Sequence, residues 1–169
     1  EEQKLYALNS AGWAPSGWTP EFFREQLGVE RIPGTGVNAS TVPGAISGYD
    51  ALLERFGNLT FQETFERAAR LAEEGWGQAE RRHRDIVGVR EKLRRDPDSN
   101  RAFLIDGEPP PLYSLVRNPD LAVALRLIQE HGRDVFYEGQ IADAIVAKVE
   151  AGGGVMTKAD LAEFESEWV

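Results

Sequence analysis

The sequence predicts a mainly α-helical fold with a short edge strand and an extended, hairpin-like segment. Three observations lead to this prediction. Apolar residues recur at spacings of three and four along several segments, which is the helical period. Helix-start signals such as Thr19-Pro20-Glu21 and Asn118-Pro119-Asp120 precede several of these segments, and glycines follow them. The 169 residues, 41% of them hydrophobic, are sufficient to bury a core.

The first forty residues are predicted to be mostly extended or irregular. Lys4–Asn9 is expected to form a strand, and the small residues of 9–12 a tight connection after it. A short helix is expected from Thr19, because a hydroxyl cap, a proline and an acid follow one another there. Residues 28–40 are expected to form a loop, because proline and glycines interrupt them.

The remaining helices are expected at 43–56, 60–75, 78–95, 118–132, 141–151 and 157–160, with a single turn at 134–139. The expected buried stripe of the first consists of Ile46, Tyr49, Leu53 and Phe56. Residues 96–100 are expected to form a loop, and 102–116 two extended pieces around Asp106-Gly107. A repeat of fixed period is absent from the sequence, which argues against a solenoid.

Composition excludes several classes of partner and site. The net charge of −9 argues against nucleic acid and anionic membrane surfaces as main partners. The absence of cysteine excludes disulfides and thiolate zinc sites. No apolar run approaches the roughly 18 residues that span a membrane. The compartment stays open between periplasmic or secreted and cytoplasmic.

Residue patterns that could carry chemistry have simpler interpretations. Gly152–Gly154 follows a helix and lacks the Lys-Ser/Thr of a phosphate loop, so it is expected to end that helix. The basic run at 80–85 alternates with acids at helical spacing, which indicates a solvated, ion-paired face. His83 belongs to that face, and His131 precedes a helix-ending glycine. We therefore expect no catalytic residue, no metal site and no cofactor in this chain.

Two stretches carry a resemblance to a known family. The first is "NASTVPGAISGYDALLERFGNLTFQETFERAARLAEEGW" (38–76), in which a Pro-Gly-started helix leads to one that closes in Leu-Ala-x-x-Gly-aromatic. The second, 115–165, contains "FYEGQIA" and then "GGVMTKADL". In this order the motifs resemble the γ-glutamyltransferase family, and the resemblance covers nearly the whole chain.

This resemblance implies a fold and a chemistry. Family members are N-terminal nucleophile hydrolases with an αββα sandwich, and the chain resembles the helical part of it. The precursor cuts itself, and the new N-terminal Thr of the small subunit attacks the substrate amide. The chain, 1–169, is thus expected to be an incomplete single domain from the large subunit, partnered by the rest of the precursor and a small-molecule amide or γ-glutamyl-type substrate. None of its threonines matches the nucleophile: Thr19, Thr35, Thr41, Thr60, Thr64 and Thr157.

The segment "YALNSAGWAP" (6–15) departs from the family pattern. There γ-glutamyl-specific members carry Arg-Glu, whose Arg holds the α-carboxylate of the donor, and this chain has Ala11 and Gly12. The methyl group of Ala11 thus takes the place of a charged guanidinium that could bind a carboxylate through two hydrogen bonds. The segment Ala11, Gly12 and Trp13 is expected to form the wall of a substrate pocket with an altered, acylase-like preference.

Two alternatives remain. In one the protein performs true γ-glutamyl transfer or glutathione hydrolysis, and another cation such as Arg24 binds the carboxylate. In the other the chain is a helical interaction module without catalysis. In all cases the chain alone is expected to be inactive, and Trp13 and Trp18 to lack partners within it.

Overall fold

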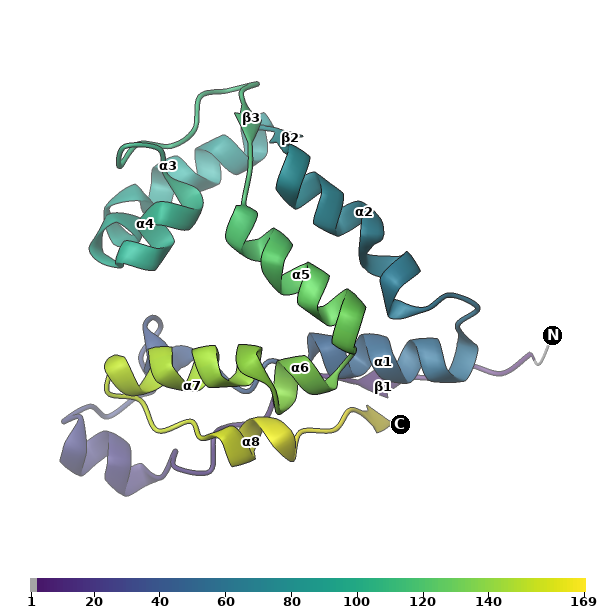
Figure 1. Cartoon of the computed structure of the whole chain (residues 1–169). Coiled ribbons are helices and arrows are strands. Elements are labelled where there is room, and N and C mark those ends of the chain that lie inside the picture. Colours follow the sequence, from purple (N-terminus) through teal and green to yellow (C-terminus); the bar gives the residue numbers. More distant parts are fainter. Residues whose placement is uncertain (1–2) are drawn as a thin grey trace. The chain divides into compact units, whose positions relative to one another are not determined.

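The computed structural model describes residues 3–169, which form two compact units (Figure 1). The first unit contains the residues up to 62 together with 130–169, and the second contains 63–129. Short antiparallel strand pairs and helices of four to sixteen residues make up both units. The expectation of a mainly helical fold is confirmed.

The first unit is built from segments distant in sequence. Its elements are β1 (Leu8–Asn9), the π-helical turn η1 (Phe22–Gln26), the 3-10 turn η2 (Val37–Ala39), α1 (Ala45–Phe56), α6 (Asp134–Tyr137), α7 (Gln140–Ala151), α8 (Lys158–Ala162) and β4 (Glu167–Trp168). Strand β1 pairs antiparallel with β4, with Leu8 opposite Trp168. The predicted strand 4–9 is therefore shorter than expected.

Aromatic and aliphatic side chains from both ends of the sequence form the core of the first unit. Its buried apolar residues are Phe22, Phe23, Val42, Ile46, Val135, Tyr137, Ala142, Val149, Met156, Leu161 and Phe164. Tyr137 is fully buried, and its hydroxyl donates to the Pro43 carbonyl at 2.7 Å and accepts from the Ser47 amide at 3.1 Å. Ser47 lies in the first turn of α1, so Tyr137 supplies the cap that Gly44 cannot.

The stripe predicted along α1 is confirmed at Ile46 but wrong at Tyr49 and Phe56. The buried residues of this helix are Ile46, Ser47 and Gly48, whereas Tyr49 and Phe56 are about half exposed. Ser10 approaches the N-terminal end of the helix closely, which favours small residues there. At the other end Phe56 contacts the rings of Tyr6 and Trp168 without being buried. The spacing of apolar residues therefore indicated the helix but not its buried face.

Four helices and one antiparallel strand pair make up the second unit. Its elements are α2 (Phe61–Glu74), β2 (Trp76–Gly77), α3 (Glu80–Arg95), α4 (Pro97–Phe103), β3 (Leu115–Val116) and α5 (Pro119–His131), with the first two residues of α2 and the last two of α5 counted in the other unit. Strand β2 pairs antiparallel with β3, with Trp76 opposite Val116. The core consists of Phe65, Ala69, Ala72, Ile86, Leu104, Val116, Ala122 and Ile128.

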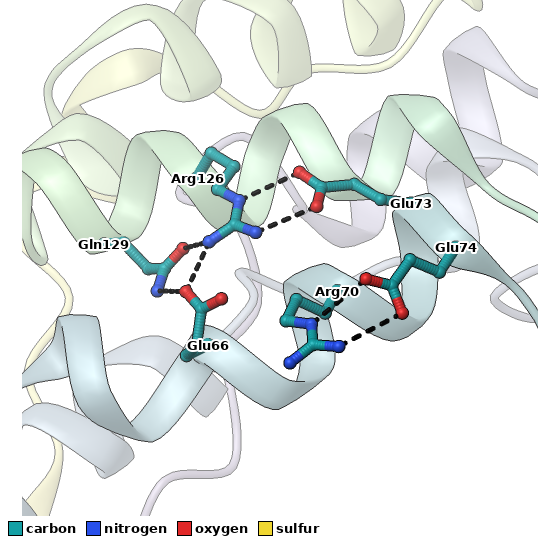
Figure 2. Close-up of polar contacts among 6 residues, drawn as sticks. All are labelled: Glu66, Arg70, Glu73, Glu74, Arg126 and Gln129. Atoms are coloured by element: carbon teal, nitrogen blue, oxygen red, sulfur yellow. Dashed lines mark hydrogen bonds and ion pairs between the residues drawn. The ribbon is translucent and has the colours of Figure 1, made fainter.

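An ionic network joins α2 to α5 (Figure 2). The Arg126 guanidinium donates to both carboxylate oxygens of Glu73, at 2.9 and 2.8 Å, and also contacts Glu66 and Gln129. These hydrogen bonds from Arg126 lower the pKa of Glu66 and of Glu73. The groups are solvent-exposed, so the network fixes the register of the two helices more than it stabilises the unit.

The loop expected at 96–100 is wrong, because α4 begins there. Asp96 is its N-cap, and the Asp96 carboxylate accepts the Ser99 amide at 2.9 Å. Pro97 occupies the first helical position, which suits its fixed φ angle and missing N–H. The Asp-Pro pair is the same kind of start signal that correctly indicated helix at Thr19-Pro20.

Other local predictions are confirmed. Asn118 caps α5 through its side chain, which accepts the Leu121 amide at 3.0 Å, and α7 ends at the predicted glycine run. A Thr157–Asp160 capping box opens α8. The expectation that Trp13 and Trp18 lack partners is wrong, because their rings meet those of Phe164 and Phe23 edge-on. Among the described residues, no helix combines the length and the apolarity needed to cross a membrane.

Candidate functional site

The segment 9–16 lies against the start of α1 and against α8, all within the first unit. Ser10 approaches the start of α1 closely at two positions. A Cβ atom on Gly44 would lie 2.1 Å from the Ser10 carbonyl oxygen, and one on Gly48 would lie 2.3 Å from the Ser10 side-chain hydroxyl. Glycines at 44 and 48 are therefore required for this packing. The run of small residues is explained first by this contact between segments.

Gly12 is confined even more tightly. A Cβ atom placed on it would lie 1.6 Å from the Val42 carbonyl oxygen, far inside any allowed contact. The neighbouring Trp13 carbonyl accepts the Val42 amide at 3.0 Å, which fixes the two chains at this spacing. Position 12 thus cannot carry the acidic side chain that the resemblance placed there unless the backbone moves.

Ala11 is exposed, unlike its neighbour. Its amide donates to the Asn9 side-chain oxygen at 3.0 Å, a short turn that holds the residue at the end of β1. Since the position is open to solvent, a methyl group there is not dictated by packing. Packing among the described residues therefore does not fix the residue type at position 11.

Trp13 is placed by contacts with the C-terminal part of the unit. Its indole N–H lies 3.4 Å from the Asp160 carbonyl oxygen, its ring meets Phe164 edge-on at 5.2 Å between centroids, and 44% of the residue stays exposed. An indole held at one edge and open at the other is a rigid apolar surface. Trp13 can therefore offer such a surface to a ligand.

Asp160 anchors the same segment through its carboxylate, which accepts the Ser16 amide at 2.8 Å and the Thr157 amide at 2.7 Å. Burial of the carboxyl raises its pKa, but these hydrogen bonds and that from the Thr157 hydroxyl outweigh burial, and the pKa is lowered overall. Asp160 is thus held as an anion that joins residues 144 positions apart.

Arg24 lines a cavity of about 310 Å³ together with Trp18, Phe23, Val29, Glu30 and Ile32. The Arg24 guanidinium lies 3.5 Å from the Glu30 carboxylate, and both side chains are exposed. Arg24, which the alternative hypothesis makes the cation that binds the donor carboxylate, therefore already lies beside an acidic residue.

The other candidate groups have structural partners. The Thr19 hydroxyl accepts the Phe22 amide at 3.1 Å, and the Thr157 hydroxyl belongs to the capping box of α8. His83 Nδ1 lies 2.9 Å from the Pro110 carbonyl oxygen. In the basic run at 80–85, Arg81 pairs with Asp85 at 2.9 Å, as the interleaved charges predicted.

Comparison with known proteins decides the family. The profile described as Gamma-glutamyltranspeptidase matches residues 1–169. The chain belongs to the gamma-glutamyltranspeptidase family. Its expected membership, from the motifs at 38–76 and 115–165, is confirmed.

Relatives in this family include both γ-glutamyl enzymes and acylases. The chain is 35% identical over 158 residues to a glutathione hydrolase proenzyme of Pseudomonas sp. (strain A14), covering 90% of the chain and 27% of that protein. It is also 35% identical over 169 residues to the acylase ACY 1 proenzyme of Pseudomonas sp. (strain SE83), covering 95% of the chain and 30% of that protein. The chain thus spans about a third or less of the curated relatives it matches.

Solved structures of the family share the fold. The cephalosporin acylase of Bacillus halodurans superposes with a TM-score of 0.93 at 32% identity, over 100% of this chain and 33% of that chain. The Helicobacter pylori gamma-glutamyltranspeptidase superposes with a TM-score of 0.90 at 29% identity, over 96% of this chain and 48% of that chain. Members of the family are enzymes, and the curated relatives named here are proenzymes.

Sequence reasoning missed the residues that hold the candidate segment in place. Asp160 was placed only in the opening turn of a short predicted helix, and its contact with Ser16 joins distant segments and has no local signal. Tyr137 lay in a predicted turn, with nothing to indicate that its hydroxyl caps α1. These residues became visible only once the family fold brought the segments together.

Proposed function

We propose that the complete protein is an amide hydrolase or acyltransferase of the N-terminal nucleophile type, and that its donor pocket accepts an uncharged acyl group in preference to γ-glutamyl. Membership in the gamma-glutamyltranspeptidase family supports the amide chemistry. The nucleophilic Thr and its oxyanion donors are assigned to the rest of the precursor, and the 169-residue chain supplies part of the pocket wall.

One observation carries the specificity: position 11 is an exposed alanine beside a glycine that has no room for a side chain. Family members specific for γ-glutamyl donors resemble this segment but carry a guanidinium here. Each charged hydrogen bond from such a group contributes about 1.5–3 kcal/mol, which is roughly a ten- to hundredfold change in a binding constant. Ala11 can contribute neither the charge nor the hydrogen bonds.

Overall identity does not separate the two activities, because the glutathione hydrolase and the acylase named above are equally similar to this chain. The difference has to come from individual pocket residues. Trp13, with its exposed indole, supports the choice of an apolar or aromatic acyl group.

Glutathione hydrolysis is the second candidate, with Arg24 replacing the missing cation. The glutathione hydrolase relatives favour it. The proximity of Glu30 to Arg24 argues against it, because Glu30 would compete with a γ-glutamyl carboxylate for the guanidinium, although this exposed pair is weak.

Two experiments test the proposal. Mass spectrometry of the expressed precursor should show self-cleavage in front of a Thr, and an uncleaved precursor without amidase activity would indicate a non-catalytic module. Steady-state kinetics of the processed protein should then give a higher kcat/KM for neutral acyl anilides than for a γ-glutamyl anilide. The opposite order would favour glutathione hydrolysis.

A further inference from the structure

A groove of about 570 Å³ runs between α3 and α4, which lie side by side in the second unit (Figure 1). Apolar side chains line most of it: Ile86, Val89 and Leu93 from α3 and Phe103 from α4. Val89 and Phe103 remain 43% and 39% exposed. The volume lies in the range of small-molecule sites, which are mostly apolar with a few placed polar groups.

Arg82 lies at one end of this groove, where Arg81 and Asp85 also contribute to the lining. Its guanidinium lies over the Trp76 ring, 5.1 Å from the centroid, and 6.0 Å from the centroid of Phe103. Its Nε atom is buried without a hydrogen-bond partner, and no ion pair of Arg82 occurs within residues 3–169. The neighbouring Arg81 is different, because Asp85 neutralises it at 2.9 Å.

The position of Arg82 on α3 also favours binding of an anion beside it. It is the third residue of the helix, where the dipole and free backbone N–H groups favour negative charge. Ala79, the N-cap residue, provides no side-chain acceptor there. Glu80 already supplies one negative charge in this first turn and accepts the Tyr113 hydroxyl. A ligand carboxylate beside Arg82 would add a second favourable anion at the helix end.

We propose that this groove binds a small amphipathic monocarboxylate, with its carboxylate on Arg82 and its apolar chain along α3. The residues at 82, 86, 89 and 93 follow one another at helical spacing on one side of α3 and span about 16 Å. A fatty or arylalkyl acid of medium length has this distribution of charge and apolar surface.

The surrounding charges favour a single carboxylate on a small molecule over an acidic protein partner. Asp85 also lines the groove and would repel a second negative group. Farther along α3, Arg90 and Arg94 are already paired with Glu108. Among the residues that line the groove, Arg81 is already paired with Asp85, so Arg82 is the cation left in the lining for one carboxylate.

Titration of the ¹⁵N-labelled chain with sodium decanoate tests the site, with decanamide as the uncharged match. The proposal predicts saturable shifts at the Trp76 indole N–H and at the backbone amides of 82–93, with decanamide bound about tenfold more weakly. Added salt should weaken decanoate binding, because it screens the ionic contact. Equal binding of the two compounds would overturn the proposal.

Matched variants locate the carboxylate. Arg82→Gln should weaken decanoate binding about tenfold. Arg84→Gln, at an exposed position of the same helix outside the groove, should not change it. Circular dichroism and thermal melting show whether each variant folds. If Arg82→Gln does not fold, Val89→Asp is used instead. This substitution should abolish decanoate binding because it puts a negative charge on the wall of the groove.

Three results would contradict a small-molecule site: unchanged decanoate affinity in both groove variants, chemical shift changes confined to other elements, or binding by this chain that disappears in the complete processed protein. Saturable binding of an acidic apolar peptide, without binding of decanoate, would identify the groove as a protein interface and also overturn the proposal. Each readout is independent of amidase activity.

Discussion

The backbone of Gly12 lies so close to Val42 that a Cβ atom would fall 1.6 Å from the Val42 carbonyl oxygen. The two segments are also joined by the hydrogen bond between the Val42 amide and the Trp13 carbonyl. Position 12 is therefore closed to any side chain, whereas position 11 beside it is exposed. This contrast makes Ala11 the one position of the pair at which a guanidinium can be introduced without moving the backbone.

Gly12→Ala should destabilise the chain by about 2 kcal/mol or more, because the methyl group has to displace main chain. Gly34→Ala is the matched control, since nothing lies within 4 Å of a Cβ atom at that position. Urea denaturation of both variants measures the difference. Equal free energies of unfolding for the two would mean that segment 9–13 does not pack on Val42 as described.

Tyr137→Phe should cost about 1–3 kcal/mol of unfolding free energy, because it leaves the Ser47 amide and the Pro43 carbonyl without their buried partner. Tyr113→Phe removes a hydroxyl from a residue that is 74% exposed and should change stability by less than about 0.5 kcal/mol. A loss of similar size in both variants would contradict the capping role of Tyr137.

Asp160 should make stability depend on pH at the acid end. Burial raises the pKa of this carboxyl, but hydrogen bonds from Thr157 and Ser16 lower it overall, below its ordinary value of 3.8. Because the folded-state pKa is lower than the unfolded one, ionised Asp160 contributes stability above the unfolded pKa. That contribution is lost as the pH falls through the folded pKa.

Asp160→Asn should therefore destabilise by about 1–3 kcal/mol at neutral pH and flatten the loss of stability below about pH 4. Asp143→Asn breaks only the exposed ion pair with Lys158 and should cost less than about 1 kcal/mol. Urea denaturation at a series of pH values gives the pH dependence of the unfolding free energy for both variants. An unchanged acid slope in Asp160→Asn would refute the assignment.

Gln78 is 1% exposed, and neither its amide oxygen nor its amide nitrogen has a hydrogen-bond partner. Gln78→Met keeps the unbranched shape and removes two unpaired polar atoms, so it should raise the unfolding free energy by about 1 kcal/mol. Gln129→Met should not stabilise, because the Gln129 amide bonds Arg126 and Glu66. Thermal melting compares the two, and destabilisation by Gln78→Met would contradict this prediction.

Local signals predicted much of the secondary structure. The caps at Asn118 and Thr157 and the glycine run after Ala151 mark the ends of α5, α8 and α7, because those interactions lie within a few residues of one another. The helix at Pro97 carried the same kind of signal and was missed because residues 96–100 as a whole were taken to form a turn or loop.

The arrangement of the candidate site was less accessible. Small residues at 9–12 were correctly singled out, but their packing against Gly44 and Gly48 depends on a contact between segments more than thirty residues apart. The anchors Tyr137 and Asp160 act over still greater separations. Such pairings follow from the family fold, and local periodicity contains no information about them.

The specificity of the complete, self-processed protein tests the central claim most directly. The measurement is the ratio of kcat/KM for a γ-glutamyl anilide to that for a neutral acyl anilide, in the unmodified protein and in Ala11→Arg. We predict a low ratio that rises about tenfold or more in Ala11→Arg, with Ala7→Arg, at an exposed position outside the candidate segment, leaving it unchanged. A high ratio in the unmodified protein, or no rise in Ala11→Arg, would contradict the claim that position 11 sets the donor preference.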